Sequence, residues 1–134
     1  MSKSKRIPIN PGWPHYEKWT LPPAVKKGNM LFISGIDATE KDPKTGVVRA
    51  TGTMAEQTRN IFKKFDMILK AAGGSWDDVV KTVDYIITWE GYKETSQVRR
   101  DFFGKEFGAA TGFMVKELVG NGALIEIDAV AVLD

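Results

Sequence analysis

The sequence predicts a single α+β domain in which short strands alternate with two helices. The chain has 134 residues, 43% of them hydrophobic, which is enough to bury one compact core. Two stretches repeat apolar residues at helical spacing, and several others are rich in β-branched and aromatic residues. The expected order is strand, strand, helix, strand, helix, strand, strand, which is typical of α+β proteins.

The first two strands are expected to form a hairpin. Residues 31–35 read LFISG, a short buried strand. Residues 42–48 read DPKTGVV, a turn in which Gly46 supplies a positive φ angle before the second strand.

The first helix is predicted to begin at a capping box formed by Thr53 and Glu56 and to end at Gly73. Its buried face repeats at helical spacing and comprises Met54, Thr58, Ile61, Phe62, Phe65, Ile68, Leu69 and Ala72. Such a stripe is typical of core packing rather than of a cofactor site.

The second half of the chain is predicted to hold three strands and one helix. The strands cover residues 79–89, 113–118 and 123–133, and the helix runs from Tyr92 to about Phe107. Two helices cover only one face of a sheet, whereas these strands are apolar on both faces. We therefore expect a second copy of the chain to cover the other face in a closed homo-oligomer.

Glu126 and Asp128 fall on the same face of the last strand, because side chains alternate along a strand. Two interpretations are open for this pair of acids. The face is solvated, or it belongs to a site that needs a base.

Composition argues against several classes of protein. Nineteen basic and seventeen acidic residues give a net charge of +2, which is too even for a protein devoted to nucleic acid. The single histidine and the absence of cysteine disfavour a metal site. No stretch is long and apolar enough to span a membrane, and the first ten residues, MSKSKRIPIN, lack a signal peptide's apolar core, so we expect a cytoplasmic protein.

Several segments match the pattern of one known family in order and spacing, from about Ala24 to the end. They are GNMLFISG at 28–35, DPKTGVV at 42–48, EQTRNIFKKFDMILKAAGGSWDDVVKT at 56–82 and ALIEIDAVAV at 123–132. Together they resemble the reactive intermediate deaminase (Rid) family, also called YjgF-like. The resemblance implies one domain over residues 1–134, with residues 1–23 as a divergent N-terminal arm.

The resemblance also implies a fold and an activity. The fold is chorismate-mutase-like, a mixed sheet with two helices on one face, and three copies form a barrel with pockets between neighbouring subunits. Typical members hydrolyse reactive enamines and imines to a keto acid and ammonia, without metal or cofactor.

Some site residues can be carried over from the family. Glu126 matches the pocket glutamate that positions or activates water, whereas Asp128 matches an acidic position outside that role. Ser34 and Gly35 match the end of the family's first strand, where a hydroxyl and backbone donors face the substrate. Without the resemblance these two residues indicate only a strand end.

Three polar anchors of the family are replaced in this chain. Thr111 stands nearest the place of the arginine that clamps the substrate carboxylate, and the last arginine in the chain is Arg100. Leu21 stands near the place of the pocket tyrosine, and Ser96 replaces an asparagine of the second helix. We interpret these changes as a changed substrate, with a retired pocket as the alternative.

Aromatic residues of the N-terminal arm are candidates to replace the lost anchors. The segment GWPHYEKW supplies Trp13, His15, Tyr16 and Trp19, which form an apolar wall at the pocket or merely pack the arm. Arg99 and Lys116 are expected on solvated faces, with a supply of positive charge to the pocket as the alternative.

Three functions are consistent with these observations. The first is a cofactor-free enzyme that hydrolyses or deaminates a small nitrogen-containing compound, either aromatic or poorly charged, such as an enamine, an imine, or an aromatic amine or amide, with Glu126 as general base. The second is a non-catalytic trimer that binds a small molecule or another protein. The third is RNA cleavage, which needs a basic and aromatic groove that the charge balance does not indicate.

Overall fold

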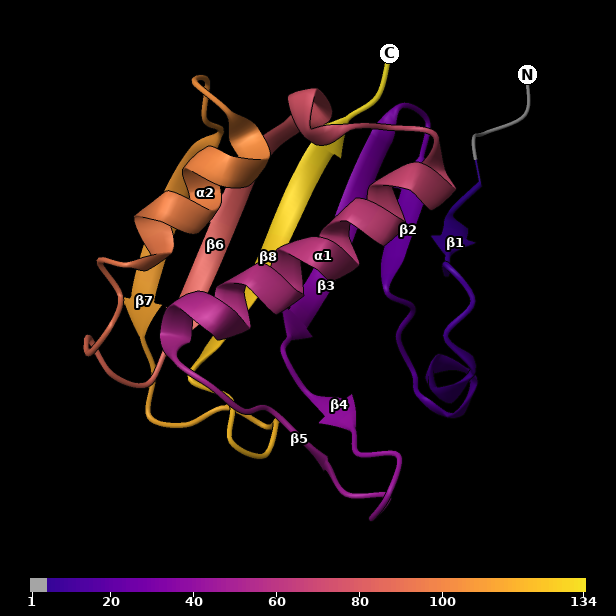
Figure 1. The fold of residues 1–134 in the computed structure, drawn as a ribbon. Coiled ribbons are helices and arrows are strands. Elements are labelled where there is room, and N and C mark those ends of the chain that lie inside the picture. Colours follow the sequence, from indigo (N-terminus) through magenta and orange to yellow (C-terminus); the bar gives the residue numbers. More distant parts are fainter. Residues whose placement is uncertain (1–4) are drawn as a thin grey trace.

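The computed structural model describes residues 5–134 as one six-stranded mixed sheet with two helices on one face (Figure 1). The strands of this sheet are β1 (Ile7–Ile9), β2 (Ala24–Lys27), β3 (Met30–Asp37), β6 (Val79–Ile86), β7 (Ala109–Met114) and β8 (Ile125–Val132). Their order is β1-β2-β3-β8-β6-β7, and only β6 and β7 run parallel. The predicted α+β class is confirmed, with β8 near the centre of the sheet.

Helix α1 (Met54–Ala72) forms as the sequence predicts. Thr53 Oγ1 accepts a hydrogen bond from the Glu56 N–H at 3.2 Å, and Glu56 Oε1 accepts one from the Thr53 N–H at 3.0 Å. Gly73 ends the helix at φ 79°, in the left-handed region that favours glycine. All eight residues of the predicted stripe are buried, so α1 supplies much of the core.

The boundaries predicted for the second half of the chain need correction. Helix α2 (Thr95–Phe103) is shorter than predicted, because Gly104 ends it and Tyr92 lies in the preceding turn. Strand β7 covers residues 109–114 rather than 113–118. Its backbone pairs with β6 from Lys81↔Ala109 to Ile86↔Met114, a long-range partnership that overrides the weak strand propensity of its small residues.

The predicted first hairpin is wrong. Residues 42–48 do form a turn with Gly46 at φ 75°, but it joins only β4 (Glu40–Lys41) to β5 (Val48–Arg49) in a separate two-stranded ribbon. Strand β3 pairs instead with β2 and β8. Strands β1 and β2 and the 3-10 helices η1 (Pro14–Lys18) and η2 (Trp76–Asp78) were not predicted.

The two faces of the sheet differ in what covers them. On the helical side the β8 residues Ile125, Ile127, Ala129 and Ala131 are buried. On the other side, here called the open face, Phe32 and Phe113 remain 46% and 50% exposed. This face has no cover within the described part of the chain, and none of the described helices is suited to cross a bilayer.

Candidate functional site

Glu126 lies near the centre of the open face. In the sheet register it stands opposite Asp37 of β3 on one side and Tyr85 of β6 on the other. Directly opposed residues of antiparallel strands present their side chains to the same face. Strand pairing therefore brings Asp37 next to Glu126, although the two residues lie far apart in the sequence.

The structure brings Glu126 and Gly35 together. The register between β3 and β8 shifts between Ile33 and Ile36, so Ser34 and Gly35 lie in an irregularity of the ladder. A Cβ added at Gly35 would stand only 2.6 Å from Glu126 Oε2. The glycine thus leaves the space that the carboxylate occupies.

The environment of Glu126 favours its protonated form. Burial raises the pKa of this carboxyl above its ordinary value, and the negative charges of Asp37 and Asp128 raise it further. A pKa closer to neutrality suits a group that must both accept and return a proton.

The other two acids of this face are held by hydrogen bonds. Tyr85 donates its hydroxyl to Asp128 Oδ2 at 2.9 Å, and Asp37 Oδ1 accepts from the backbone N–H and the hydroxyl of Thr39. Within residues 5–134 no side-chain hydrogen bond engages the Glu126 carboxylate. Of the three acids, Glu126 is the one with both carboxylate oxygens left for a substrate or water, whereas Asp37 and Asp128 each have one oxygen engaged.

Ser34 is tied to the N-terminal segment. Its hydroxyl donates to the Pro22 carbonyl at 2.7 Å, and its backbone N–H donates to the Pro23 carbonyl at 2.9 Å. Both donors of Ser34 are therefore used within the chain, which fixes the segment that leads into β2. Contact between Ser34 and a substrate stays a prediction.

Trp19 and Leu21 line an open cleft of about 640 Å³ at the N-terminal segment, together with Tyr16, Pro22 and Val25 among others. The rings of Tyr16 and Trp19 are arranged edge to face, with their centroids 4.7 Å apart. Burial, followed by the charges of Asp37 and Glu126, raises the pKa of Tyr16 to about 12. Tyr16 therefore links this aromatic segment electrostatically to the acids of the open face.

Thr111 and Ser96 lie apart from these residues. Thr111 is exposed on the edge strand β7, which β6 separates from β8. Ser96 is on α2, on the helical side of the sheet, where it lines a second cavity. A single chain does not bring Ser96 and Glu126 into one pocket.

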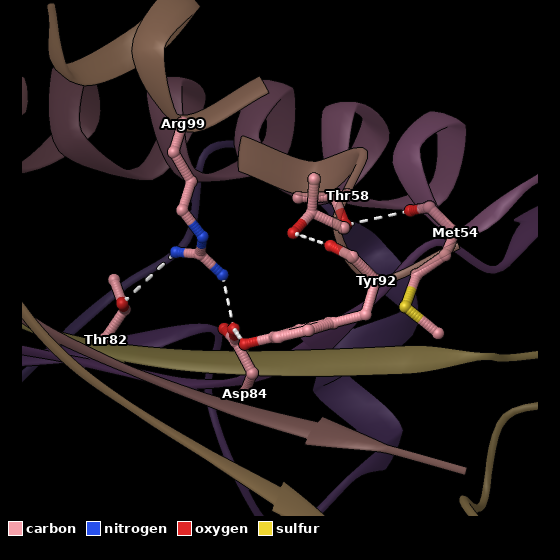
Figure 2. A network of polar contacts seen from close by, with 7 residues as sticks. Met54, Thr58, Thr82, Asp84, Tyr92 and Arg99 are labelled. Atoms are coloured by element: carbon pink, nitrogen blue, oxygen red, sulfur yellow. Dashed lines mark hydrogen bonds and ion pairs between the residues drawn. The ribbon is translucent and has the colours of Figure 1, made fainter. Parts of the chain in front are cut away.

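The preferred expectation that Arg99 lies on a solvated face is wrong. Its Nη2 forms an ion pair with Asp84 Oδ2 (Figure 2). The Arg99 side chain is only 16% exposed. Tyr92 also donates to Asp84 Oδ2, at 2.6 Å, and burial together with this bond raises the pKa of Tyr92 to about 12. Lys116, in contrast, is exposed.

The Asp84 carboxylate is not fully satisfied. This side chain is 1% exposed, and its Oδ1 has no hydrogen-bond partner among residues 5–134. No cluster of three histidine, cysteine, aspartate or glutamate side chains in the same range is arranged to hold a metal ion.

The residues that sequence reasoning did not select for the site are Asp37 and Tyr85. Asp37 and Tyr85 carry no motif, and only the strand register places them beside Glu126. Tyr16, in contrast, was a candidate through the aromatic density of its segment, and it lines the same cleft as Trp19.

The sequence profile of the family described as Endoribonuclease L-PSP matches residues 18–133. The chain belongs to this family. A RutC family protein of Pyrococcus horikoshii is 36% identical over 108 residues, which cover 81% of this chain and 82% of the relative. The 3-aminoacrylate deaminase RutC of Acinetobacter baylyi is 37% identical over 109 residues, 81% of this chain and 83% of that protein.

A solved structure supports the same membership for this L-PSP family chain. A member of the YjgF/YER057c/UK114 family from Mycobacterium tuberculosis has a TM-score of 0.78 and 25% identity. The match covers 96% of this chain and 100% of that one. The resemblance to the Rid or YjgF-like family and its fold is thus confirmed, whereas the roles of individual residues stay predictions.

Proposed function

We propose that this protein is a Rid-type deaminase that hydrolyses a small enamine or imine, with Glu126 as the proton-transfer group. The observation that carries the proposal is the state of Glu126. It is half-buried, its pKa is raised, it lies over Gly35, and it is free of side-chain hydrogen bonds within the described residues. A related protein, RutC of Acinetobacter baylyi, is named as a deaminase.

The proposed reaction uses one water molecule. An enamine first takes a proton on carbon to give an iminium ion, whereas an imine is protonated on nitrogen. Water then adds to the carbon of the C=N bond while Glu126 accepts a proton from it. Glu126 returns this proton to the nitrogen, the C–N bond breaks, and ammonia leaves. The hydroxyl group loses its proton to solvent as the carbonyl group forms, which balances the proton that the substrate takes from solvent in the first step.

The proposed pocket lies between two copies of the chain. One copy contributes Glu126, Gly35 and Ser34, with Leu21 and Trp19 as the apolar wall. The neighbouring copy contributes Thr111, which is exposed on the edge strand β7. Ser96 lines a cavity on the helical side of the sheet, so we leave it out of this pocket. The exposed rings of Phe32 and Phe113 support an assembly through the open face, and we propose a homotrimer.

The charges of the open face favour a substrate without an acidic group. Asp37 and Asp128 raise the pKa of Glu126, and no cation is among the groups that shift it. Thr111 offers a hydroxyl rather than a guanidinium to a substrate carboxylate. The same negative charges disfavour RNA, whose phosphates would be repelled.

The experiment is a comparison of two substrates of similar size, 2-aminoacrylate and a neutral enamine that lacks the carboxylate. Ammonia and carbonyl product are measured while each enamine is generated in situ. We expect the neutral enamine to have a kcat/KM at least about tenfold higher, because no arginine clamps the carboxylate. Equal kcat/KM values would contradict the assigned specificity, and turnover of neither would favour the non-catalytic trimer.

A further inference from the structure

A second cavity lies on the helical side of the sheet, between α2 and the paired strands β6 and β7. It has a volume of about 290 Å³, and the side chains that line it include Ser96, Arg99, Arg100, Phe103, Phe107 and Ala110. Glu126 faces the open side, so the sheet separates this cavity from the Glu126 of the same chain. The deaminase reaction assigns no role to Arg99, Arg100, Phe103 or Phe107.

Arg99 presents a pre-organised guanidinium to the cavity. Its position is fixed by the ion pair with Asp84 and by a 3.4 Å contact from Nη1 to Thr82 Oγ1 (Figure 2). The Phe62 ring, whose centroid lies 5.6 Å from Cζ, packs against the guanidinium as well. A guanidinium has five N–H donors in a planar fork, and these contacts leave some of them unused. Little side-chain entropy remains to be lost when a ligand binds such a group.

Arg100 adds a positive charge that nothing nearby neutralises. Its side chain is exposed and forms no ion pair within the described part of the chain. No acidic residue lines the cavity. The negative charge of Asp84 compensates the positive charge of Arg99. The charge of Arg100 therefore gives the cavity a net positive charge, which suits an anionic ligand.

The remaining walls suit an aromatic ring. The rings of Phe103 and Phe107 lie 6.1 Å apart at an interplanar angle of 52°, and Phe107 is 54% exposed in spite of its size. On the strand side the cavity is lined by Gly108 and Ala110, which fill little of its volume. A Cβ at Gly108 would stand 3.0 Å from the Val79 carbonyl oxygen. Ligand pockets typically span about 300–1,000 Å³, so this cavity fits a ligand with a single ring.

We propose that this cavity is a binding site for a small aromatic carboxylate. The carboxylate group pairs with the guanidinium groups of Arg99 and Arg100, and the ring packs against Phe103 and Phe107. Arginine suits this task because its fork matches the two oxygens of a carboxylate. The site is separate from the proposed proton-transfer chemistry and does not depend on it.

The test is a titration of the protein with benzoate. Binding is monitored by calorimetry and by the backbone amide resonances of residues 96–110. We expect saturable binding that Arg100→Gln weakens about tenfold or more, the usual effect of losing a hydrogen bond to a charged group. Lys105→Gln is the matched control, because it removes an equal charge just beyond α2 from a residue that does not line the cavity. It should change the affinity less than twofold.

Three further measurements test the assignment to this cavity. Ala110→Phe should fill the cavity and abolish benzoate binding while the thermal melt shows an intact fold. Glu126→Gln should leave benzoate binding unchanged. Benzamide, which keeps the ring but lacks the charge, should bind much more weakly.

The proposal is overturned if benzoate fails to saturate, if benzamide binds as well, or if Arg100→Gln and Lys105→Gln weaken binding equally. Loss of benzoate binding in Glu126→Gln would assign the ligand to the deaminase pocket instead. If the protein turns over enamines but does not bind benzoate, the proposed deaminase function stands and only the proposed benzoate site is refuted.

Discussion

The carboxylate of Glu126 occupies the space that a side chain at position 35 would need, since a Cβ there would stand 2.6 Å from Oε2. Asp37 has the same relationship to Gly120, whose added Cβ would stand 2.1 Å from Asp37 Oδ2. Two adjacent acids of the open face are thus each held against a glycine. The sheet can carry them side by side because these glycines leave room.

Gly35→Ala should impair catalysis more than stability. The added methyl group meets the mobile end of Glu126, so the carboxylate can move aside at little cost to the fold. A displaced general base should lower kcat/KM by roughly 10- to 100-fold, while the free energy of unfolding changes by less than about 1 kcal/mol. Steady-state kinetics and urea unfolding measure the two quantities. Full activity in this variant would show that the position of Glu126 over residue 35 is irrelevant.

Asp37→Asn should shift the pH dependence of activity downward. If Glu126 acts as a base, kcat/KM rises with pH as its carboxyl loses the proton, at a midpoint above the ordinary 4.5 of a glutamate. Removing the charge of Asp37 removes one cause of the raised pKa, so the midpoint should move to lower pH. A pH–rate profile of both proteins checks this. A midpoint that stays in place or rises would mean that Asp37 does not influence Glu126.

Arg99→Leu should destabilise the fold, because it leaves the buried Asp84 carboxylate without its cation. Breaking a buried pair from one side costs about 3–5 kcal/mol. The matched variant is Asp84→Asn with Arg99→Leu, which removes both charges and keeps an acceptor for the Tyr92 hydroxyl. Its free energy of unfolding should exceed that of Arg99→Leu alone. A cost below about 1 kcal/mol for Arg99→Leu would contradict a stabilising role for the buried pair of Asp84 and Arg99.

The protein should form a homotrimer of about three times its 14.9 kDa chain mass, because the open face needs a cover. Phe113→Glu places a charge on that face and should lower the average mass in light scattering. Val119→Glu is the control, since Val119 is fully exposed in the loop before β8. A wild-type monomer at micromolar concentration would contradict both the assembly and the shared pocket.

Local patterns in the sequence predict some elements of this fold well. The signals that predict helix α1 are a capping box, an apolar stripe and a terminal glycine, and all of them lie within residues 53–73. Strand β8 is predicted by its alternation of buried apolar residues with partly exposed ones. Strand β7 was displaced in the prediction because its small residues carry little strand signal and its partner β6 is remote. The N-terminal strands β1 and β2 likewise depend on pairing with β3 rather than on a local pattern.

The candidate site divides in the same way. The resemblance to the family selected Glu126 and Gly35 together, and the structure places them in contact. Asp37 and Tyr85 could not be selected, since only the register of three strands brings them next to Glu126. The pair of Asp84 and Arg99 was missed for the same reason, because one lies on a strand and the other on a helix.

Glu126→Gln is expected to keep the fold and lose the chemistry. The amide retains shape and hydrogen-bonding capacity but cannot accept the proton. Because the folded protein raises the pKa of Glu126, this residue's contribution to stability falls as pH rises from its unfolded pKa through the raised one. At neutral pH the glutamine variant should therefore be at least as stable as the wild type. Thermal melts at neutral pH check this expectation.

The most direct test of the account is the turnover number of Glu126→Gln beside that of Asp128→Asn, measured on the neutral enamine. The first variant should lose roughly 10²–10⁴-fold in kcat, the range expected for removal of a general base, with the trimer and the thermal melt preserved. Asp128→Asn alters the neighbouring acid of the same strand face and keeps an oxygen for the Tyr85 hydroxyl, so its kcat should stay within a few fold. A Glu126→Gln protein with wild-type kcat, or a loss of kcat that appears only together with loss of the fold, would contradict the central role given to Glu126.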